Sequence, residues 1–281
     1  MRVSRFFVMT LVATLFAAVL AISGFAQTTV VVTPSAYHGW FFYNDESDTI
    51  DNTLGSFVVG PGTPFSGVGS AQMSVTGTQR RNLATYQFSG TPLASITTLK
   101  FTTYNPSAGN GGSATRSAYL HFNVDFNGSD TWQRRLVFVP SVNGTVVQNF
   151  WQEWDAINGG LALWSYSGGT WPAGVGGGGE PGTTTKTWTQ VLSQYPGVRI
   201  RATDAFVGMR VGEPYADGYT DNIDSFKFGT AAGTTTFDFE PFAVATNKDQ
   251  CKNGGWANYR RADGSVFKNQ GDCVSYTSNG K

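Results

Sequence analysis

The stretch YLHFNVDF, residues Tyr119–Phe126, gives the clearest indication of the fold class of this chain. Its apolar and polar side chains alternate, so that one face carries Leu120, Phe122, Val124 and Phe126 and the other carries His121, Asn123 and Asp125. Because successive side chains of a strand point to opposite faces, this period of two is typical of an antiparallel strand with one buried face. The stretch therefore predicts a half-buried strand that covers a core on one side.

Short runs of the same kind recur on both sides of this strand. Examples rich in β-branched or aromatic residues are Trp40–Tyr43, Leu99–Tyr104, Phe206–Val211 and Ile223–Phe228. The 35 glycines of the chain, together with Pro, Asn and Asp, separate nearly all of these runs. Many short strands joined by tight turns predict an all-β protein, an antiparallel β-sandwich of the jelly-roll or lectin-like kind.

One short helix is expected between the strands. The sequence TWTQ, Thr187–Gln190, fits a capping box, and Pro196-Gly197 supplies a stop signal after a short apolar face. The loop before it, residues 167–185, is rich in Gly, Thr and Pro. Loops of that length are usually functional or mobile.

The first 26 residues have the features of a secretory signal peptide. Arg2 and Arg5 precede an apolar run from Phe6 to Ile22, and small residues lead up to Ala26. A retained membrane anchor is the alternative, but the run is slightly short for a span and ends as cleaved signals do. We therefore expect cleavage after Ala26 and a secreted, extracellular mature chain with no membrane span.

Both cysteines of the chain, Cys251 and Cys273, lie in its last part. Because exported proteins fold in an oxidising compartment, the two thiols are expected to form a disulfide, and two cysteines allow one intramolecular pairing. Closing this loop should stabilise the tail by roughly 3 kcal/mol in the chain-entropy model. Two free thiols are the alternative, whereas a redox-active pair is disfavoured because a CxxC spacing is missing.

These features divide the chain into three parts. We expect a signal peptide over residues 1–26, a β-sandwich domain over residues 27–242 and a disulfide-linked module over residues 243–281. The last part is too short to bury a substantial core of its own, which explains why it would need a disulfide cross-link.

The charge balance argues against nucleic acid as a partner. Nineteen Lys and Arg residues offset nineteen Asp and Glu residues, so the formal net charge is zero. Arginines occur in pairs at Arg80-Arg81, Arg134-Arg135 and Arg260-Arg261, and isolated pairs of this kind are usually solvated surface. Composition therefore favours neither nucleic acid nor an anionic membrane.

Paired carboxylates offer a catalytic alternative. Glu153 and Asp155 lie two apart in WQEWD, so on a strand they would share one face beside tryptophans. Two carboxylates that flank a glycosidic bond can hydrolyse it. The simpler interpretation, which we favour, is a strand end with solvated acids. The chain has two histidines, so few residues are available to form a Ser-His-Asp triad or a zinc site.

Asp217, Asp221 and Asn222 are the candidate metal ligands. They lie in the segment DGYTDN, whose density of oxygen side chains suits calcium, although the spacing does not match an EF-hand loop. The alternative is an Asx-type turn in which Asp221 and Asn222 bond the local backbone. Calcium is the one cofactor that the sequence suggests.

Trp164, Tyr166 and Trp171 are the candidate ligand-binding residues. Trp164 and Tyr166 share one face of a predicted strand, and Trp171 lies in the Gly-rich loop that follows. Sugar rings stack on exposed aromatic faces through their apolar C–H surfaces. The alternative is that these rings fill the core, as many aromatic side chains do. Their position beside a polar loop favours exposure.

Several stretches of the chain match a pattern known from other proteins. In the first domain they are HGWFFYND (His38–Asp45), GPGTPFSGVGSAQ (Gly60–Gln72), LATYQFSGTPL (Leu83–Leu93), ITTLKFTTY (Ile96–Tyr104), WQRRLVFVP (Trp132–Pro140), GTV…FWQEWDA (Gly144–Ala156), WTQVLSQYPGVRIR (Trp188–Arg201) and GYTDNIDSFKFG (Gly218–Gly229). On these stretches the chain resembles exported bacterial proteins of unassigned function with a jelly-roll-like β-sandwich. The tail, NKDQCKNGGW…FKNQGDCVSY, is similar to a C-terminal cystine module of diverse exported bacterial proteins. The resemblance implies no established activity.

These observations lead to three functional hypotheses. The leading one is a secreted or cell-surface binding module without catalysis, whose partner is a carbohydrate or another cell-surface polymer. The second is an exported glycoside hydrolase or polysaccharide lyase, which would use Glu153 and Asp155. The third is a structural surface protein. Binding to polysaccharide separates the first hypothesis from the third, and release of reducing sugar separates the first from the second.

Overall fold

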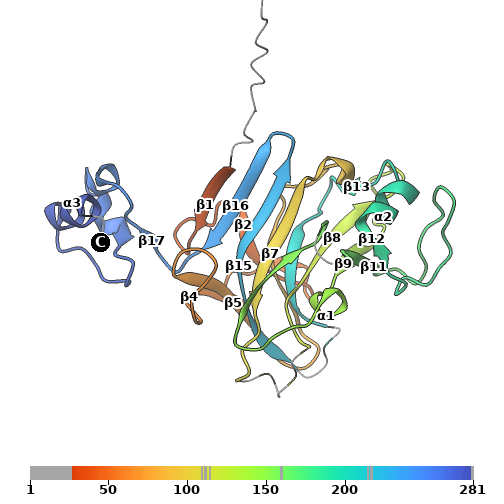
Figure 1. Ribbon diagram of the computed structural model, residues 1–281, viewed down its shortest axis with the longest axis horizontal. Helices are drawn as coiled ribbons and strands as arrows, with labels where there is room; N and C mark the ends of the chain where they lie inside the picture. The colour runs from red at the N-terminus through yellow and green to blue at the C-terminus, as the bar shows by residue number, and fades with distance from the viewer. Residues whose placement is uncertain are drawn as a thin grey trace, which may run out of the picture.

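The computed structural model describes residues 27–108, 110, 113, 115–158, 161–213, 215 and 218–279. The expected signal peptide, residues 1–26, and the candidate ligand Asp217 lie outside the described residues. The described part is mostly strand, and its two large sheets face each other as a sandwich (Figure 1). The prediction of an all-β sandwich with largely antiparallel pairing is confirmed.

The first of these, the seven-stranded sheet, is arranged around a long central strand. In the part of the chain that the structure describes, its strands are β1 (Gln27–Val32), β16 (Gly233–Phe239), β15 (Tyr219–Thr230), β5 (Gly69–Val75), β4 (Gly55–Val59), β7 (Thr98–Tyr104) and β10 (Trp151–Asp155). The central β15 pairs antiparallel with β16, β5 and β7, whereas β1 pairs in parallel with β16. A bulge between Asp224 and Lys227 interrupts the register of β15.

The nine-stranded sheet covers the other side of the core. Within the described ranges its strands are, in order, β12 (Lys186–Thr187), β11 (Leu163–Tyr166), β9 (Arg135–Phe138), β8 (Tyr119–Asp125), β14 (Val207–Gly212), β6 (Arg80–Thr85), β2 (Trp40–Asn44) and β3 (Thr49–Ile50), with β13 (Arg199–Ile200) also paired to β8. Neighbouring strands in this sheet pair antiparallel.

The strand β8, which contains most of the YLHFNVDF stretch, shows the predicted alternation but is buried on both faces. Leu120, Phe122 and Val124 lie in the core between the sheets. His121 and Asn123 point to the outer face and are buried as well. The expectation of a half-exposed strand is therefore wrong. β8 lies in the middle of its sheet, where side chains from neighbouring strands and loops cover its polar face.

The helices are short and lie outside the two large sheets. They are α1 (Pro140–Asn143), α2 (Trp188–Gln194) and α3 (Gln270–Ser278), with 3-10 turns at Leu93–Ser95, Lys248–Cys251 and Gly255–Asn258. The capping box of α2 is confirmed, because the Thr187 side chain accepts from the Gln190 N–H and the Gln190 side chain accepts from the Thr187 N–H. The helix α3 was not anticipated. No helix among the residues described is both long and apolar enough to cross a membrane.

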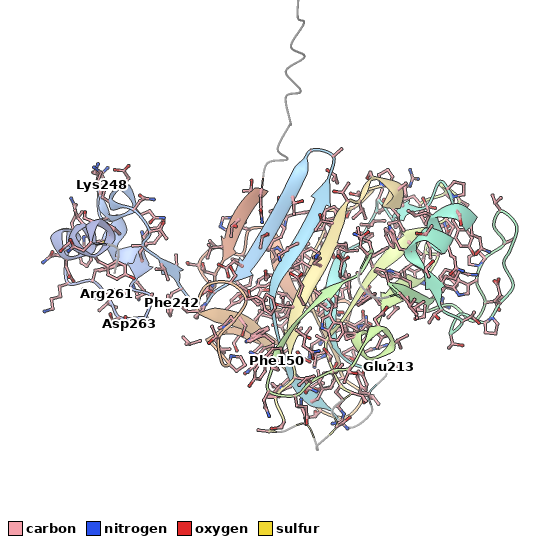
Figure 2. The ribbon with its side chains drawn as sticks, viewed as in Figure 1. Phe150, Glu213, Phe242, Lys248, Arg261 and Asp263 are labelled. Carbon is pink, nitrogen blue, oxygen red and sulfur yellow. A yellow bond between two sulfur atoms is a disulfide. The ribbon has the colours of Figure 1, made fainter. Side chains whose placement is uncertain are left out.

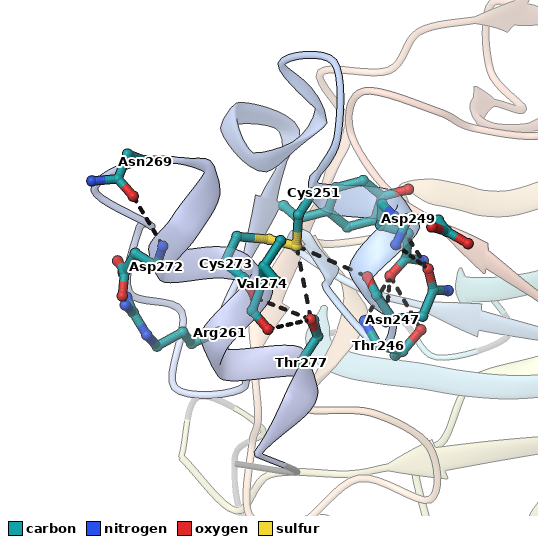
Figure 3. Close-up of a disulfide and its surroundings, with 12 residues drawn as sticks. Thr246, Asn247, Asp249, Cys251, Arg261, Asn269, Asp272, Cys273, Val274 and Thr277 are labelled. Atoms are coloured by element: carbon teal, nitrogen blue, oxygen red, sulfur yellow. Dashed lines mark hydrogen bonds and ion pairs between the residues drawn. A yellow bond between two sulfur atoms is a disulfide. The ribbon is translucent and has the colours of Figure 1, made fainter.

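The tail forms a small unit beside the edge of the sandwich at β1 and β4 (Figure 1). The predicted disulfide Cys251–Cys273 is present and ties the 3-10 turn Lys248–Cys251 to α3 (Figure 3). The two cysteines, Ala245 and Phe267 form a small buried cluster around it. A short pairing of β17 (Ala243–Val244) with β18 (Tyr259–Arg260) connects this cluster to the chain that leaves the sandwich.

Candidate functional site

The three aromatic residues that the sequence suggested for ligand binding are buried. Trp171 is 1% exposed, and Trp164 and Tyr166 also belong to the hydrophobic core. The Trp164 ring contacts the rings of Phe122 and Phe138, with centroids 5.2 and 5.6 Å away, and its indole N–H donates to the carbonyl of Ala156. The expectation that these rings are exposed for stacking is therefore wrong.

The Gly-rich loop, residues 167–185, explains why Trp171 is buried. The loop folds back on itself, and a Cβ added at Gly182 would lie 1.9 Å from the carbonyl oxygen of Gly168. Glycine at this position permits that close backbone approach. The fold-back brings the carbonyl of Thr184 within 2.8 Å of the Trp171 indole nitrogen and places Lys186 Nζ 5.2 Å from the ring centroid. The loop closes over the ring instead of presenting it.

Glu153 and Asp155 share one face of β10, as predicted, but they are ion-paired to lysines. Lys100 Nζ lies 3.2 Å from a carboxylate oxygen of each, and Lys227 Nζ lies 2.5 Å from Glu153. Burial raises the pKa of both acids, but hydrogen bonds from the lysines and, for Asp155, from backbone N–H groups outweigh it and leave both pKa values lowered. Neither group holds the proton that a general acid must donate, so the arrangement does not favour glycoside hydrolysis.

Asp221 and Asn222 do not form a common metal site. They are consecutive in β15, so their side chains point to opposite faces. Asp221 accepts from the N–H of Ala118 at 2.8 Å, whereas the Asn222 amide donates to Ser70 Oγ at 2.9 Å. Among the described residues, no group of three or more His, Cys, Asp or Glu side chains could hold a metal ion. The two residues lie in a strand and not in the predicted turn.

Polar and aromatic side chains instead gather on the outer face of the nine-stranded sheet. The strand registers align two rows of side chains across this face. One row consists of Tyr43, Asn82, Arg210 and Tyr119, and the next consists of Phe41, Ala84, Gly208, His121 and Val137. Residues far apart in the chain are thereby brought side by side.

Two adjoining hollows of about 460 and 450 Å³ lie over this face, and together we call them the outer-face groove. Both are lined by Trp132 and Arg135. The lining of the first half, called the basic half, includes Arg80, Tyr119, His121, Arg134, Arg210 and Glu213. The lining of the second, called the aromatic half, includes Tyr43, Asp48, Tyr86, Arg201, Asp204 and Phe206.

The loop between β8 and β9 positions Trp132 at the boundary of the two halves. Asp125 at the end of β8 accepts from the N–H of Gly128 and from the side-chain amide of Gln133. Asp130 accepts from the N–H groups of Ala202 and Thr203 and so ties the loop to a neighbouring segment. These bonds fix both ends of the short segment that carries Trp132, whose side chain stays exposed.

The floor of the basic half is organised around Asp45. Arg135 Nη2 and Arg210 Nη2 lie 2.9 and 2.8 Å from the same oxygen of this carboxylate, whose side chain is 5% exposed. Arg80 Nε lies 3.6 Å from the other oxygen. Two further bonds hold the guanidinium groups, from Arg135 Nε to Asn123 and from Arg210 Nε to Asn82. The arginine heads are therefore fixed in place before any ligand arrives.

His121 is neutral in this floor and donates a hydrogen bond from one ring nitrogen. Asn82 Oδ1 accepts from Arg210 Nε, which always carries a proton, and it lies 2.7 Å from His121 Nε2. His121 Nε2 must therefore donate. Burial, followed by the charges of Arg210 and Arg135, lowers the pKa of His121 well below its usual range, so its Nδ1 keeps a lone pair. Neither His121 Nδ1 nor Asn82 Nδ2 has a hydrogen-bond partner among the described residues.

The aromatic half combines rings with hydroxyl groups. Phe41, Tyr43, Ala84 and Phe206 form a small buried cluster on the outer face, and Tyr86 lies against Phe41 with ring centroids 4.8 Å apart. The Phe206 ring covers Gly208, where an added Cβ would approach within 3.1 Å of it. Tyr86 and Trp132 remain 39% and 47% exposed. The groove thus has exposed ring faces beside a fixed polar floor.

Most of this site was not predicted from the sequence. The polar face of YLHFNVDF contains His121 and Asn123, and the pair Arg134-Arg135 was interpreted as solvated surface. Arg135 instead has 18% of its side chain exposed and contributes to the groove floor. Polar residues on a predicted central strand were the available signal, but their partners on β2, β6 and β14 could not be assigned without the strand order.

No family model matches this chain, and no curated protein is similar to it in sequence. One solved structure that it resembles is a carbohydrate-binding module in complex with β-1,4-galactotriose. The identity is 9%, the match covers 69% of this chain and 89% of that chain, and the TM-score is 0.28. At this TM-score the likeness carries no argument about the ligand of the present chain.

Proposed function

We propose that this protein is a non-catalytic binding module that holds a polysaccharide chain in the outer-face groove. The observation that carries the proposal is the pairing of two exposed rings, Trp132 and Tyr86, with a fixed polar floor in one groove. A sugar ring has an apolar C–H face and a polar rim of hydroxyl groups. Exposed aromatic faces match the first, and fixed donors and acceptors match the second.

The extent of the groove favours a polymer over a single small sugar. Trp132 and Arg135 line both halves, so the two hollows form one continuous surface. A side chain at the shared boundary can contact one sugar unit while neighbouring units reach the basic and aromatic halves. Preorganised side chains also reduce the entropy lost on binding, because few rotamers have to be fixed.

The proposal includes an extracellular setting. The amino-terminal sequence up to Ala26, with its basic start, apolar run and small-residue end, supports export of the chain. Polysaccharides that are exposed outside the cell would then be the available partners. No catalytic residue is assigned, and Glu153 and Asp155 are given a structural role in their ion pairs with Lys100 and Lys227.

Affinity electrophoresis against a panel of soluble polysaccharides tests the proposal. We expect retardation by at least one polysaccharide, and we expect Trp132→Ala to weaken that binding by about tenfold, as the loss of an exposed aromatic anchor does. Phe150→Ala is the matched control, because Phe150, which is labelled in Figure 2, is a 63% exposed aromatic residue that does not line the groove. This control should bind like the unmodified protein.

Two results would count against the proposal. One is that no polysaccharide retards the protein. The other is that binding occurs but Trp132→Ala and Phe150→Ala affect it equally, which would place the binding surface elsewhere. Circular dichroism of both variants verifies that each is folded before binding is compared.

A further inference from the structure

The basic half of the outer-face groove has more positive than negative groups. Three guanidinium groups, those of Arg80, Arg135 and Arg210, surround the single carboxylate of Asp45. Two of them share one of its oxygens, at 2.9 and 2.8 Å. One carboxylate cannot neutralise three guanidinium groups. The cluster therefore keeps an excess of positive charge unless other anions offset it.

The neighbouring acidic side chains do not neutralise this excess of positive charge. Glu46 is bound by both Arg80 and Arg81, and Glu213 lies 3.4 Å from Arg80. Arg134 lines the same half and has no ion-pair partner among the described residues. Counted over the described residues around this half, five arginines (Arg80, Arg81, Arg134, Arg135 and Arg210) face three carboxylates (Asp45, Glu46 and Glu213).

The other titratable groups around this half do not change the sign of its net charge, which stays positive. His121 is neutral because burial and the nearby arginines lower its pKa. Tyr119 stays protonated because burial raises its pKa, and its hydroxyl donates to the carbonyl of Glu213. Burial, and then the charge of Arg210, lowers the pKa of Arg135, which shows that these two guanidinium groups oppose each other. Asp45, which contacts both groups, offsets this effect in part, and a second anion would reduce the repulsion further.

The arginines have donors left for such an anion. Arg210 Nε donates to Asn82, whereas its buried Nη2, although 2.8 Å from an oxygen of Asp45, makes no hydrogen bond of good geometry among the residues described. Arg135 Nη1 has one long contact, 3.5 Å from Asp45. Guanidinium groups bind planar oxyanions with two parallel hydrogen bonds, a geometry that suits a carboxylate. Trp132 lies next to these donors, with its ring centroid 5.3 Å from Arg135 Cζ.

We propose that the outer-face groove selects acidic polysaccharides, with the carboxylate of a uronic acid unit bound by Arg134, Arg135 and Arg210 while its ring stacks on Trp132. This inference rests on the proposed function and specifies its ligand class. The aromatic half is less basic, because Asp48 and Asp204 lie there with Arg201 and the shared Arg135. Neutral units of the same chain are therefore assigned to that half.

Matched polysaccharides test the inference. Binding is measured at low ionic strength, by affinity electrophoresis or calorimetry, to polygalacturonate and to its fully methyl-esterified form, which keeps the chain and removes the charge. Dextran sulfate and dextran form a second pair, which separates carboxylate from sulfate. We expect binding to polygalacturonate to be about tenfold tighter than binding to its ester, and to weaken as salt screens the charges.

Variants test whether the preference for the acidic polysaccharide arises in the groove. Arg134→Gln removes an exposed charge with little risk to folding, and Arg80→Gln removes a second; each should reduce the preference for the acid several-fold. Arg260→Gln in the tail is the matched control and should leave the preference unchanged. Trp132→Ala should weaken binding to both members of a pair.

The outcomes separate the two proposals. Equal binding to polygalacturonate and its ester, still dependent on Trp132, overturns the inference and leaves the proposed function standing. A preference for dextran sulfate without one for polygalacturonate overturns the assignment of a carboxylate. A preference for the acid that Arg260→Gln reduces as much as Arg134→Gln does also overturns it. Failure of every polymer to bind in a Trp132-dependent manner overturns both proposals.

Discussion

The guanidinium group of Arg135 lies over the indole ring of Trp132, with its Cζ 5.3 Å from the ring centroid. The same guanidinium is held by Asn123 Oδ1 at 3.1 Å and by Asp45 Oδ1 at 2.9 Å. An exposed ring is therefore supported by a charged group that is itself anchored to the sheet. Cation–π contacts at partly exposed sites contribute about 0.5–1 kcal/mol, enough to bias the orientation of the ring.

Replacing Arg135 by lysine tests this support. Arg135→Lys keeps the positive charge but loses the planar stack on Trp132 and the forked contact with Asp45. We expect polysaccharide affinity to fall several-fold and the free energy of unfolding to fall by about 1–2 kcal/mol. Urea denaturation and affinity electrophoresis provide the two measurements. Unchanged affinity in a folded Arg135→Lys protein would show that the positive charge at this position is enough for polysaccharide binding.

Removing the carboxylate beneath the arginines should destabilise the fold strongly. Asp45→Asn leaves Arg135 and Arg210 without their shared counter-ion, and breaking a buried pair in this way costs about 3–5 kcal/mol. Glu213→Gln is the matched control, because the Glu213 side chain is 57% exposed and its loss should change stability by less than about 0.5 kcal/mol. Equal melting temperatures for the two variants would contradict this role of Asp45.

Trp171 is predicted to stabilise the fold. Trp171→Ala removes a ring that is 1% exposed and a hydrogen bond to Thr184, so we expect a loss of about 3–5 kcal/mol in the free energy of unfolding. Trp132→Ala, at an exposed ring, should cost less than about 1 kcal/mol. Chemical denaturation of both variants makes the comparison, and similar losses would show that the loop, residues 167–185, does not cover Trp171 in solution.

Stability should also depend on pH through Glu240. Its carboxylate accepts from the N–H groups of Val68 and Gly69 at 2.7 and 3.0 Å. Burial, followed by the charge of Asp238, raises the pKa of Glu240 from 4.5 to about 7. The folded state therefore holds this proton more tightly than the unfolded state does. Between these two pH values the folded state binds more protons, so its stability falls as the pH rises.

We accordingly expect the free energy of unfolding to be higher at pH 5 than at pH 7.5, by on the order of 1–3 kcal/mol. Asp224 and Asp238, whose pKa values burial also raises, act in the same direction. Glu240→Gln mimics the protonated form and should flatten this dependence, whereas Glu213→Gln should not. Urea denaturation across this pH range measures both, and an undiminished slope in Glu240→Gln would remove Glu240 as the cause.

The disulfide should stabilise the tail alone. Its buried cluster of Ala245, Cys251, Phe267 and Cys273 is separate from the core of the sandwich. Replacing both cysteines by serine removes a cross-link over 22 residues, which the chain-entropy model values at roughly 3 kcal/mol. We expect faster amide hydrogen exchange in α3 and an unchanged melting temperature of the sandwich. A parallel loss of protection in β8 would show that the two units unfold together.

Features that depend on neighbouring residues or on simple counts were predictable from the amino-acid sequence. The alternation in YLHFNVDF predicted a strand because side-chain direction along a strand follows position. The capping box at Thr187 and Gln190 was predictable because its two hydrogen bonds lie within one turn. The pairing of Cys251 with Cys273 followed because the chain offers no other partner within itself.

Which side chains are exposed, and which come into contact, depends on the three-dimensional packing of the chain. Trp171 is buried and Trp132 is exposed, although both follow polar, turn-rich sequence, because exposure depends on what covers a residue. Tyr43, Asn82, Arg210 and Tyr119 form one row because β2, β6, β14 and β8 are neighbours in the sheet. Strand order results from burying one shared core by long-range pairing, and no local pattern encodes it. The groove therefore exists only in the folded sheet.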